Sequence, residues 1–167
     1  MLQVIIDRDL RDPHLFEGEE PFDLVFGSPP YWPVHAHRLP NHPQRIPALL
    51  EVRGSIADYA LTAARLLAPG GVFAVVFPND QRDRSMKGLA DAGLVAVRRR
   101  EVIFKEGAPY GLDLIISARR TDLPPNFEVL AQCPEVEPPL FMRTTAGRVH
   151  PSIARMRLSI GINPGAL

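Results

Sequence analysis

Two apolar runs with little polar alternation constrain the fold of this chain most. Residues 22–27 read FDLVFG and residues 72–78 read VFAVVFP, and a helical pattern over residues 55–67 stands between them. Strands that are apolar on both sides are typical of a parallel sheet covered on both faces. A helix between two such strands forms a right-handed parallel crossover. The sequence therefore predicts an α/β fold.

The predicted helix carries its own start signal. Ser55 with Asp58 three positions later forms an approximate capping box. Its apolar residues fall on one face at i, i+3, i+4 and i+7 spacing: Ile56, Tyr59, Ala60, Ala63 and Leu67. This face is expected to cover the sheet.

Further elements are predicted on both sides of this unit. A short apolar run over residues 3–7 indicates a buried strand, and a weaker helical pattern covers roughly residues 81–92. Residues 94–104 and 112–120 read as strands joined by a short loop, which predicts an antiparallel hairpin.

Composition limits the function classes. The 167 residues carry 19 Lys and Arg and 19 Asp and Glu, so nucleic-acid contact would need a local basic patch. A single cysteine, Cys133, excludes an internal disulfide and a cysteine metal cluster. No apolar run approaches the ~20 residues of a membrane span, and no secretory signal pattern opens the chain. We expect a cytoplasmic location and no metal.

The strand over residues 22–27 ends in Ser28-Pro29-Pro30-Tyr31-Trp32. Neither proline can donate to a sheet, so the strand must stop here. The two rings fix φ and remove two N–H groups, which leaves a stiff segment that presents carbonyl oxygens without a competing donor.

These residues resemble a class I S-adenosylmethionine-dependent methyltransferase over about residues 3–120. The Ser-Pro-Pro-Tyr sequence matches the [Asn/Asp/Ser]-Pro-Pro-[Tyr/Phe/Trp] motif of enzymes that methylate planar nitrogens. The stretches EVRGSIADYALTAARLLAPGG and FKEGAPYGLDLIISARR are similar to bacterial tRNA (valine) adenine-N6 methyltransferases. The resemblance implies a partial Rossmann-like sheet, mostly parallel with a C-terminal antiparallel hairpin. It also implies a catalytic domain over residues 1–120 and an extension over 121–167 that packs on it.

The resemblance assigns roles to the motif residues. An exocyclic amine is a poor nucleophile, and acceptors aimed at its protons stabilise the charge that develops during methyl transfer. The Ser28 side chain and the Pro29 carbonyl would supply these acceptors, with Pro30 stiffening the turn. Tyr31 would stack on a base that has left its helix. Serine replaces the commoner Asn or Asp here and is familiar in cytosine-N4 methyltransferases, so adenine and cytosine both stay open as targets.

The resemblance also points to a cofactor site. Asp9 stands where the family holds the adenine amine of S-adenosylmethionine, and Leu10 would flank that adenine. Asp7 and Asp12 compete for the acidic role. The Gly-rich turn of the family is absent, so we expect a missing N-terminal segment or a partner chain to complete the sheet, and weak cofactor binding without it. The sheet would otherwise keep an exposed apolar edge.

For substrate binding, Trp32 and Lys105 are candidates. Lys105 and a wider set of cations would contact phosphates: Arg82, Arg84, Lys87, Arg98, Arg99 and Arg100. The function that the resemblance implies is methyl transfer to adenine N6 in tRNA. Two alternatives stay open: a protein glutamine N5-methyltransferase, and a truncated, non-catalytic domain that binds nucleic acid or a partner subunit.

Overall fold

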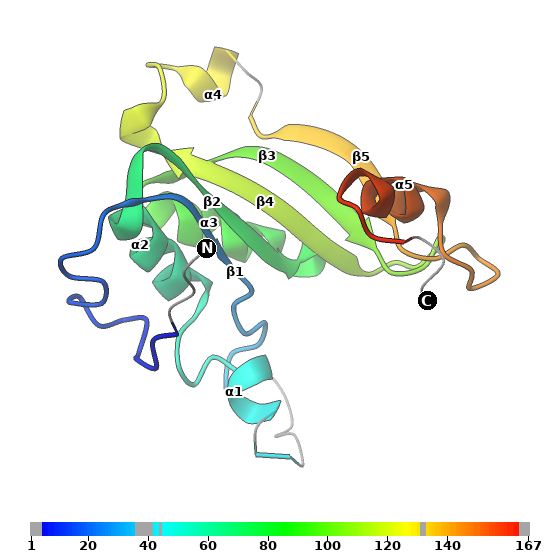
Figure 1. The fold of residues 1–167 in the computed structure, drawn as a ribbon, viewed down its shortest axis with the longest axis horizontal. Helices are drawn as coiled ribbons and strands as arrows, with labels where there is room; N and C mark the ends of the chain where they lie inside the picture. The colour runs from blue at the N-terminus through cyan, green and yellow to red at the C-terminus, as the bar shows by residue number, and fades with distance from the viewer. Residues whose placement is uncertain (1–4, 36–41, 44, 131–132, 164–167) are drawn as a thin grey trace.

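A computed structural model describes residues 5–35, 42–43, 45–130 and 133–163. It contains one five-stranded sheet in the order β1-β2-β4-β3-β5 (Figure 1). The strands are β1 (Phe22–Gly27), β2 (Leu67–Pro78), β3 (Leu94–Ile103), β4 (Gly111–Arg119) and β5 (Glu135–Phe141). The helices are α1 (Arg45–Leu49), α2 (Ile56–Leu66), α3 (Arg82–Asp91), α4 (Phe127–Leu130) and α5 (Pro151–Ser159). Two short 3-10 turns, Asn79–Gln81 and Arg120–Asp122, follow β2 and β4.

The pairing of the strands matches the α/β class predicted from the sequence. β1 pairs parallel with β2 across the α2 crossover. β3 and β4 form the predicted antiparallel hairpin, and β4 also runs antiparallel to β2. β5 adds a parallel edge beside β3, so part of the C-terminal segment belongs to the same sheet.

The helix α2 begins as its sequence predicts. The Ser55 hydroxyl accepts from the backbone N–H of Asp58, and the Asp58 carboxylate accepts from the backbone N–H of Ser55, which completes the capping box. The helix ends at Leu66, one residue before the predicted end, because Leu67 already belongs to β2.

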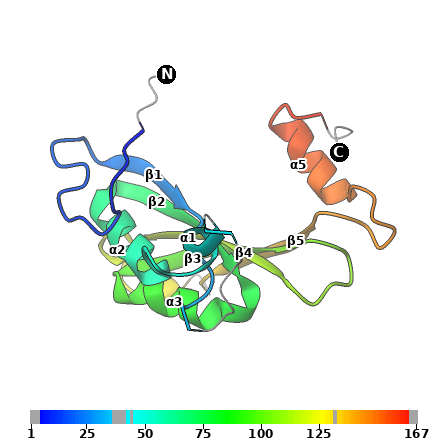
Figure 2. The ribbon, with the colours of Figure 1, turned by 90° about the horizontal axis from the view of Figure 1, so that it is seen from below.

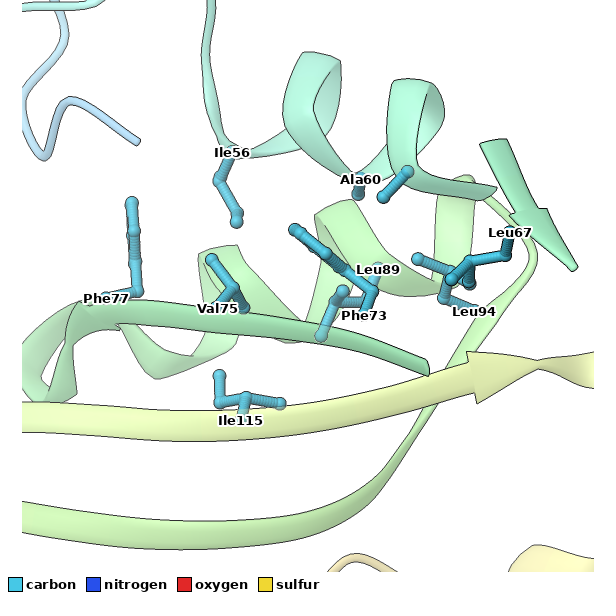
Figure 3. Packing of buried hydrophobic residues seen from close by; sticks show 10 residues of the cluster. Ile56, Ala60, Leu67, Phe73, Val75, Phe77, Leu89, Leu94 and Ile115 are labelled. Atoms are coloured by element: carbon cyan, nitrogen blue, oxygen red, sulfur yellow. The ribbon is translucent and has the colours of Figure 1, made fainter. Parts of the chain in front are cut away.

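The core lies between the sheet and the two helices α2 and α3, which cover the same face (Figure 2). Figure 3 shows the side chains of this core. They come from α2, β2, α3, β3 and β4: Ile56, Ala60, Ala63, Leu67, Phe73, Val75, Phe77, Leu89, Leu94 and Ile115. Phe73, Val75 and Phe77 alternate along β2 and all point toward the helices. The short helix α5 lies on the opposite side of the sheet, at one end (Figure 2).

The predicted buried strand over residues 3–7 is wrong in its described part. Ile5 to Asp7 form no strand, and the Ile5 side chain is 86% exposed; residues 3 and 4 lie outside the described residues. The following segment packs on α2 instead, where Thr62 donates to the carbonyl of Leu10 at 2.8 Å. β1 therefore stands at the edge of the described sheet, with Leu24 and Phe26 exposed, as expected for an uncovered apolar edge.

No helix in the described part of the chain is both long and apolar enough to span a bilayer.

Candidate functional site

The Ser-Pro-Pro-Tyr motif lies at the carboxyl end of β1, where ligands bind in open α/β sheets. Ser28 is exposed, while Pro29 and Pro30 are buried and anchor the turn. Gly27 lets the turn approach α2 closely, because a Cβ atom there would stand 2.9 Å from the Tyr59 ring. The motif is therefore held against the core by its two prolines, while Ser28 is exposed and Tyr31 is partly exposed.

Tyr31 is half-buried beside Ser28. Its ring meets the Phe77 ring edge to face, with 5.8 Å between centroids and 82° between planes. Its hydroxyl lies 3.4 Å from the Ser28 hydroxyl, so the two polar groups converge at the end of β1. The core thus fixes one edge of the tyrosine ring and orients its hydroxyl toward the predicted acceptor.

Arg84 holds the segment after the motif in place. From α3 it donates to the Tyr31 carbonyl at 3.2 Å and forms an ion pair with Glu51, and its guanidinium lies 5.6 Å from the centroid of the Phe77 ring. The backbone of Trp32 is also fixed, since it donates to Leu49 at 3.1 Å and accepts from Glu51 at 2.9 Å. Sequence reasoning assigned Arg84 to phosphate, but its charge is engaged inside the protein.

A cavity of about 950 Å³ opens beside the motif. The structure brings both predicted cofactor residues, Asp9 and Leu10, to its wall together with Pro30 and Tyr59. Asp7, the competing carboxylate, lines it too, whereas Asp12 does not. The volume lies at the upper end of the range of small-molecule sites.

The Asp9 carboxylate already accepts hydrogen bonds from within the chain. Arg11 donates to its carboxylate from the side chain at 2.9 and 2.6 Å and from the backbone at 2.9 Å. These hydrogen bonds hold the pKa of Asp9 well below its ordinary value, so the group is ionised throughout the neutral range. Sequence reasoning did not foresee this partner two positions away.

Trp32 lines a different cavity, of about 360 Å³, at the same end of the sheet. Its other walls come from Pro78, Asp80, Tyr110 and Gly111. Asp80 and Tyr110 were not singled out from the sequence. Their signal was positional, because each stands next to a strand end, Asp80 just after β2 and Tyr110 just before β4.

Lys105 is not brought to the motif. It is exposed in the loop between β3 and β4 and lines neither of the two cavities described above. No group of three His, Cys, Asp or Glu among the described residues could hold a metal ion.

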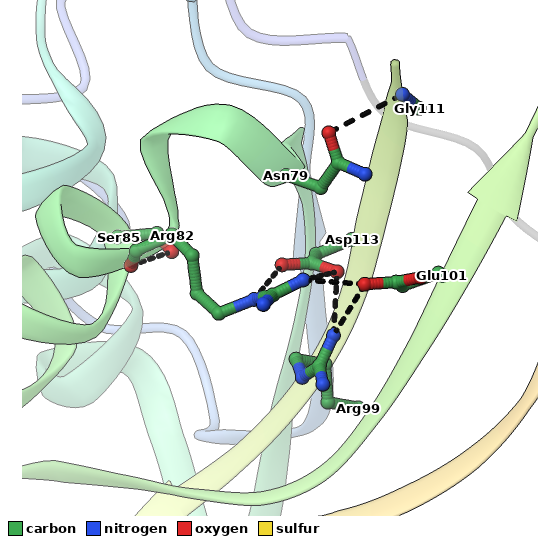
Figure 4. Close-up of polar contacts among 7 residues, drawn as sticks. All are labelled: Asn79, Arg82, Ser85, Arg99, Glu101, Gly111 and Asp113. Carbon is green, nitrogen blue, oxygen red and sulfur yellow. Dashed lines mark hydrogen bonds and ion pairs between the residues drawn. The ribbon is translucent and has the colours of Figure 1, made fainter. Parts of the chain in front are cut away.

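Figure 4 shows that two further predicted phosphate contacts, Arg82 and Arg99, are paired with carboxylates of the protein. Asp113 on β4, with a side chain only 1% exposed, accepts from Arg82 at 2.8 Å and from Arg99 at 3.0 Å. Glu101 accepts from the same two arginines, at 2.6 and 3.2 Å. This group, the α3-side cluster, ties the start of α3 to β3 and β4, and its two cations are paired with carboxylates of the protein.

Three further predicted phosphate contacts are paired at the surface. Arg98 and Arg100 point to the other side of β3 from Arg99 and meet Glu137 of β5 at 3.2 and 3.5 Å. Lys87 meets Asp91 at 2.6 Å along α3. None of these cations lies at the motif.

The chain was compared with protein-family models, with curated proteins and with solved structures. No protein-family model matches the chain. Over 101 residues, 59% of this chain, the sequence is 32% identical to the tRNA1(Val) (adenine(37)-N6)-methyltransferase of Tolumonas auensis. The match covers 41% of that relative, so the chain spans about two fifths of its length.

Solved structures show the fold. A predicted O-methyltransferase from Agrobacterium tumefaciens superposes with a TM-score of 0.53 and 15% identity, over 91% of this chain and 58% of that one. The crystal structure of M1.HpyAVI superposes more weakly, with a TM-score of 0.47 and 12% identity over 93% of this chain and 73% of that one. The methyltransferase resemblance predicted from the sequence, and the α/β fold it implies, are confirmed.

Proposed function

We propose that this chain is the target-recognising part of an S-adenosylmethionine-dependent methyltransferase that methylates an exocyclic amino nitrogen. The proposed target is N6 of an adenine in tRNA. The observation that carries the proposal is the end of β1. There the hydroxyl oxygens of the exposed Ser28 and the half-buried Tyr31 lie 3.4 Å apart. The two prolines between them are buried and hold the segment in place. The sequence similarity to a tRNA adenine-N6 methyltransferase supports the choice of target.

The residues act by orienting the amine. The Ser28 hydroxyl and the Pro29 carbonyl would accept its two protons, which favours the developing positive charge on nitrogen. Tyr31 would hold the base flat by stacking, an interaction worth about 1–3 kcal/mol. Among the described residues no side chain at the motif is placed as a general base, so the departing proton would pass to solvent.

The residues of the large cavity fit the cofactor. When bound, S-adenosylmethionine supplies an electrophilic methyl group. Asp9 offers an ionised carboxylate as acceptor for an adenine amine, and Leu10 and Tyr59 offer apolar surface in the same cavity. Pro30 belongs to both the cavity wall and the motif, which would bring the cofactor next to the target amine.

The first test follows radiolabelled methyl groups from S-adenosylmethionine into tRNA and into protein. We expect label in RNA, as N6-methyladenine after nuclease digestion. Label in glutamine side chains of protein would contradict the RNA assignment. A chain that transfers no label to either, and binds no tRNA, would favour a role in completing a partner subunit.

A second readout does not depend on turnover. An RNA with 2-aminopurine in place of the target adenine loses the fluorescence of its unstacked base when that base stacks on Tyr31. Tyr31→Ala should abolish the quenching and weaken RNA binding by about 5- to 100-fold, the equivalent of one stacked base. Tyr31→Phe keeps the ring and should behave like the wild type. Equal quenching in all three proteins would contradict the role given to Tyr31.

A further inference from the structure

Cationic side chains gather in the last part of the chain. Residues 138–167 contain four arginines and no Asp or Glu, although the whole chain has a net charge of zero. The four are Arg143, Arg148, Arg155 and Arg157, and we refer to them together with Lys105 as the C-terminal basic lobe. This segment is part of the 121–167 extension, to which no motif of the sequence assigns a role.

A hairpin carries the first two arginines and is attached to the chain next to Lys105. Residues 143–149 close on themselves through a bridge between Arg143 and Val149. The hairpin is attached to the loop after β3, because the Glu106 N–H donates to the Arg143 carbonyl at 2.9 Å. Glu106 also accepts from the backbone of the hairpin at 3.4 Å and is the one carboxylate in this contact among the described residues.

The helix α5 carries the other two arginines. Ile153 is buried and the Ser152 hydroxyl donates to the carbonyl of Phe141 at 3.0 Å, so the helix is fixed to β5. Arg155 is exposed and lines a shallow cavity of about 440 Å³ between α5 and β3. Hairpin and helix lie at the same end of the sheet in Figure 1.

These cations lack the partners that neutralise the others. Within the described ranges, the side chains of Lys105, Arg148, Arg155 and Arg157 make no ion pair and no hydrogen bond, and Arg143 donates only to the carbonyl of Gly147. The α3-side cluster, by contrast, places two arginines on two carboxylates. The positive charge that reaches solvent is therefore local, as a phosphate-binding surface requires.

The lobe also lies at the correct end of the molecule. β3 ends at Ile103, which pairs with Gly111, the first residue of β4 and a wall of the Trp32 cavity. β1 ends at Gly27, which pairs with Val75 near the end of β2. The motif, the Trp32 cavity and the basic lobe thus share one end of the sheet.

We propose that the C-terminal basic lobe binds the phosphate backbone of the RNA whose base enters the site. The proposal rests on the proposed function for its choice of RNA. Phosphate contacts fix the position of a strand without reading its sequence. The lobe would hold the strand while Tyr31 receives one base.

An anionic membrane surface fits less well. Met156 and Leu158 are exposed on α5, as in some membrane-binding helices. They stand two positions apart, however, which is about 200° around a helix, so they do not share one face. The arginines are moreover divided between the hairpin and the helix, whereas an interfacial helix carries its cations on one polar face.

The test measures binding of a fluorescein-labelled single-stranded RNA of about 20 nucleotides by anisotropy, without cofactor. Arg148→Glu/Arg155→Glu should lower the affinity at least tenfold at low salt. The slope of log K against log salt should fall by about 1.4, the loss of two phosphate contacts to a single strand. Lys87→Glu/Arg120→Glu makes the same charge change away from the lobe and should alter the affinity about twofold or less.

Equal losses in the two double variants would overturn the proposal, as would tighter binding to phosphatidylglycerol vesicles than to RNA with the same variant dependence. If the Arg148→Glu/Arg155→Glu protein does not fold, the proposal can still be tested on the wild-type protein. Phenylglyoxal modification, read by mass spectrometry, should be slowed by RNA at Arg148 and Arg155 but not at Arg120; no protection would overturn the proposal. A protein that binds RNA as described yet transfers no methyl group would count against the proposed function alone.

Discussion

The α3-side cluster and the C-terminal basic lobe use the same residue type for opposite purposes. In the cluster, Arg82 and Arg99 meet Asp113, whose side chain is 1% exposed. In the lobe, Arg148 and Arg155 are exposed and face no carboxylate of the described chain. An arginine is structural here where a strand or helix brings a carboxylate to it, and open to a ligand where none is near. The net charge of zero does not reveal this difference between the two regions, because it sums over the whole chain.

The largest effect is expected at the centre of the cluster. Asp113→Ala leaves the guanidinium of Arg99, 11% exposed, with only Glu101 for its charge. Breaking a buried ion pair from one side costs about 3–5 kcal/mol. Urea unfolding should therefore show a loss of that size in the free energy of unfolding.

The matched control removes charge from the lobe. Arg148→Ala/Arg155→Ala should change the free energy of unfolding by no more than about 0.5 kcal/mol, as surface substitutions usually do. A stability loss in the lobe variant as large as that of Asp113→Ala would erase the distinction between the two regions.

The sequence predicted part of this division. Side chains alternate along a strand, so Arg98, Arg99 and Arg100 cannot all point the same way. The alternation could not say which faced the core, because the register of β3 against β4 decides that Arg99 lies beside Asp113. The pairing depends on residues far apart in the chain, which no local pattern encodes.

The site shows the same limit. Local signals placed the motif correctly at the end of β1, since two prolines must end a strand. The described part of the strand predicted over residues 3–7 is not a strand, because a short apolar run does not by itself specify a neighbour to pair with. The hydrogen bond from Arg84 to the Tyr31 carbonyl could not be predicted from local sequence patterns either, because the two residues are 53 positions apart.

A second substitution tests a paired arginine that serves the site. Arg84→Ala removes the ion pair with Glu51 and the donor to the Tyr31 carbonyl. We expect a loss of about 1–3 kcal/mol in stability, because Glu51 is left without its charged donor. The 2-aminopurine quenching assigned to Tyr31 should weaken as well, whereas Asp113→Ala should leave it unchanged in the folded protein. A variant that loses stability but keeps full quenching would make Arg84 purely structural.

A small effect on stability is expected at the ion pairs between β3 and β5, which lie between the cluster and the lobe. Arg98 and Arg100 both meet Glu137 on β5, but the Arg98 side chain is 52% exposed. Exposed ion pairs contribute about 0–1 kcal/mol and weaken as salt screens them. Arg98→Gln/Arg100→Gln should cost no more than that in low salt and still less in high salt. RNA affinity should hardly change, because Glu137 already neutralises these cations. A tenfold loss of RNA affinity would instead extend the binding surface from the lobe onto β3, and carboxylate pairing would no longer separate structural from ligand-binding arginines.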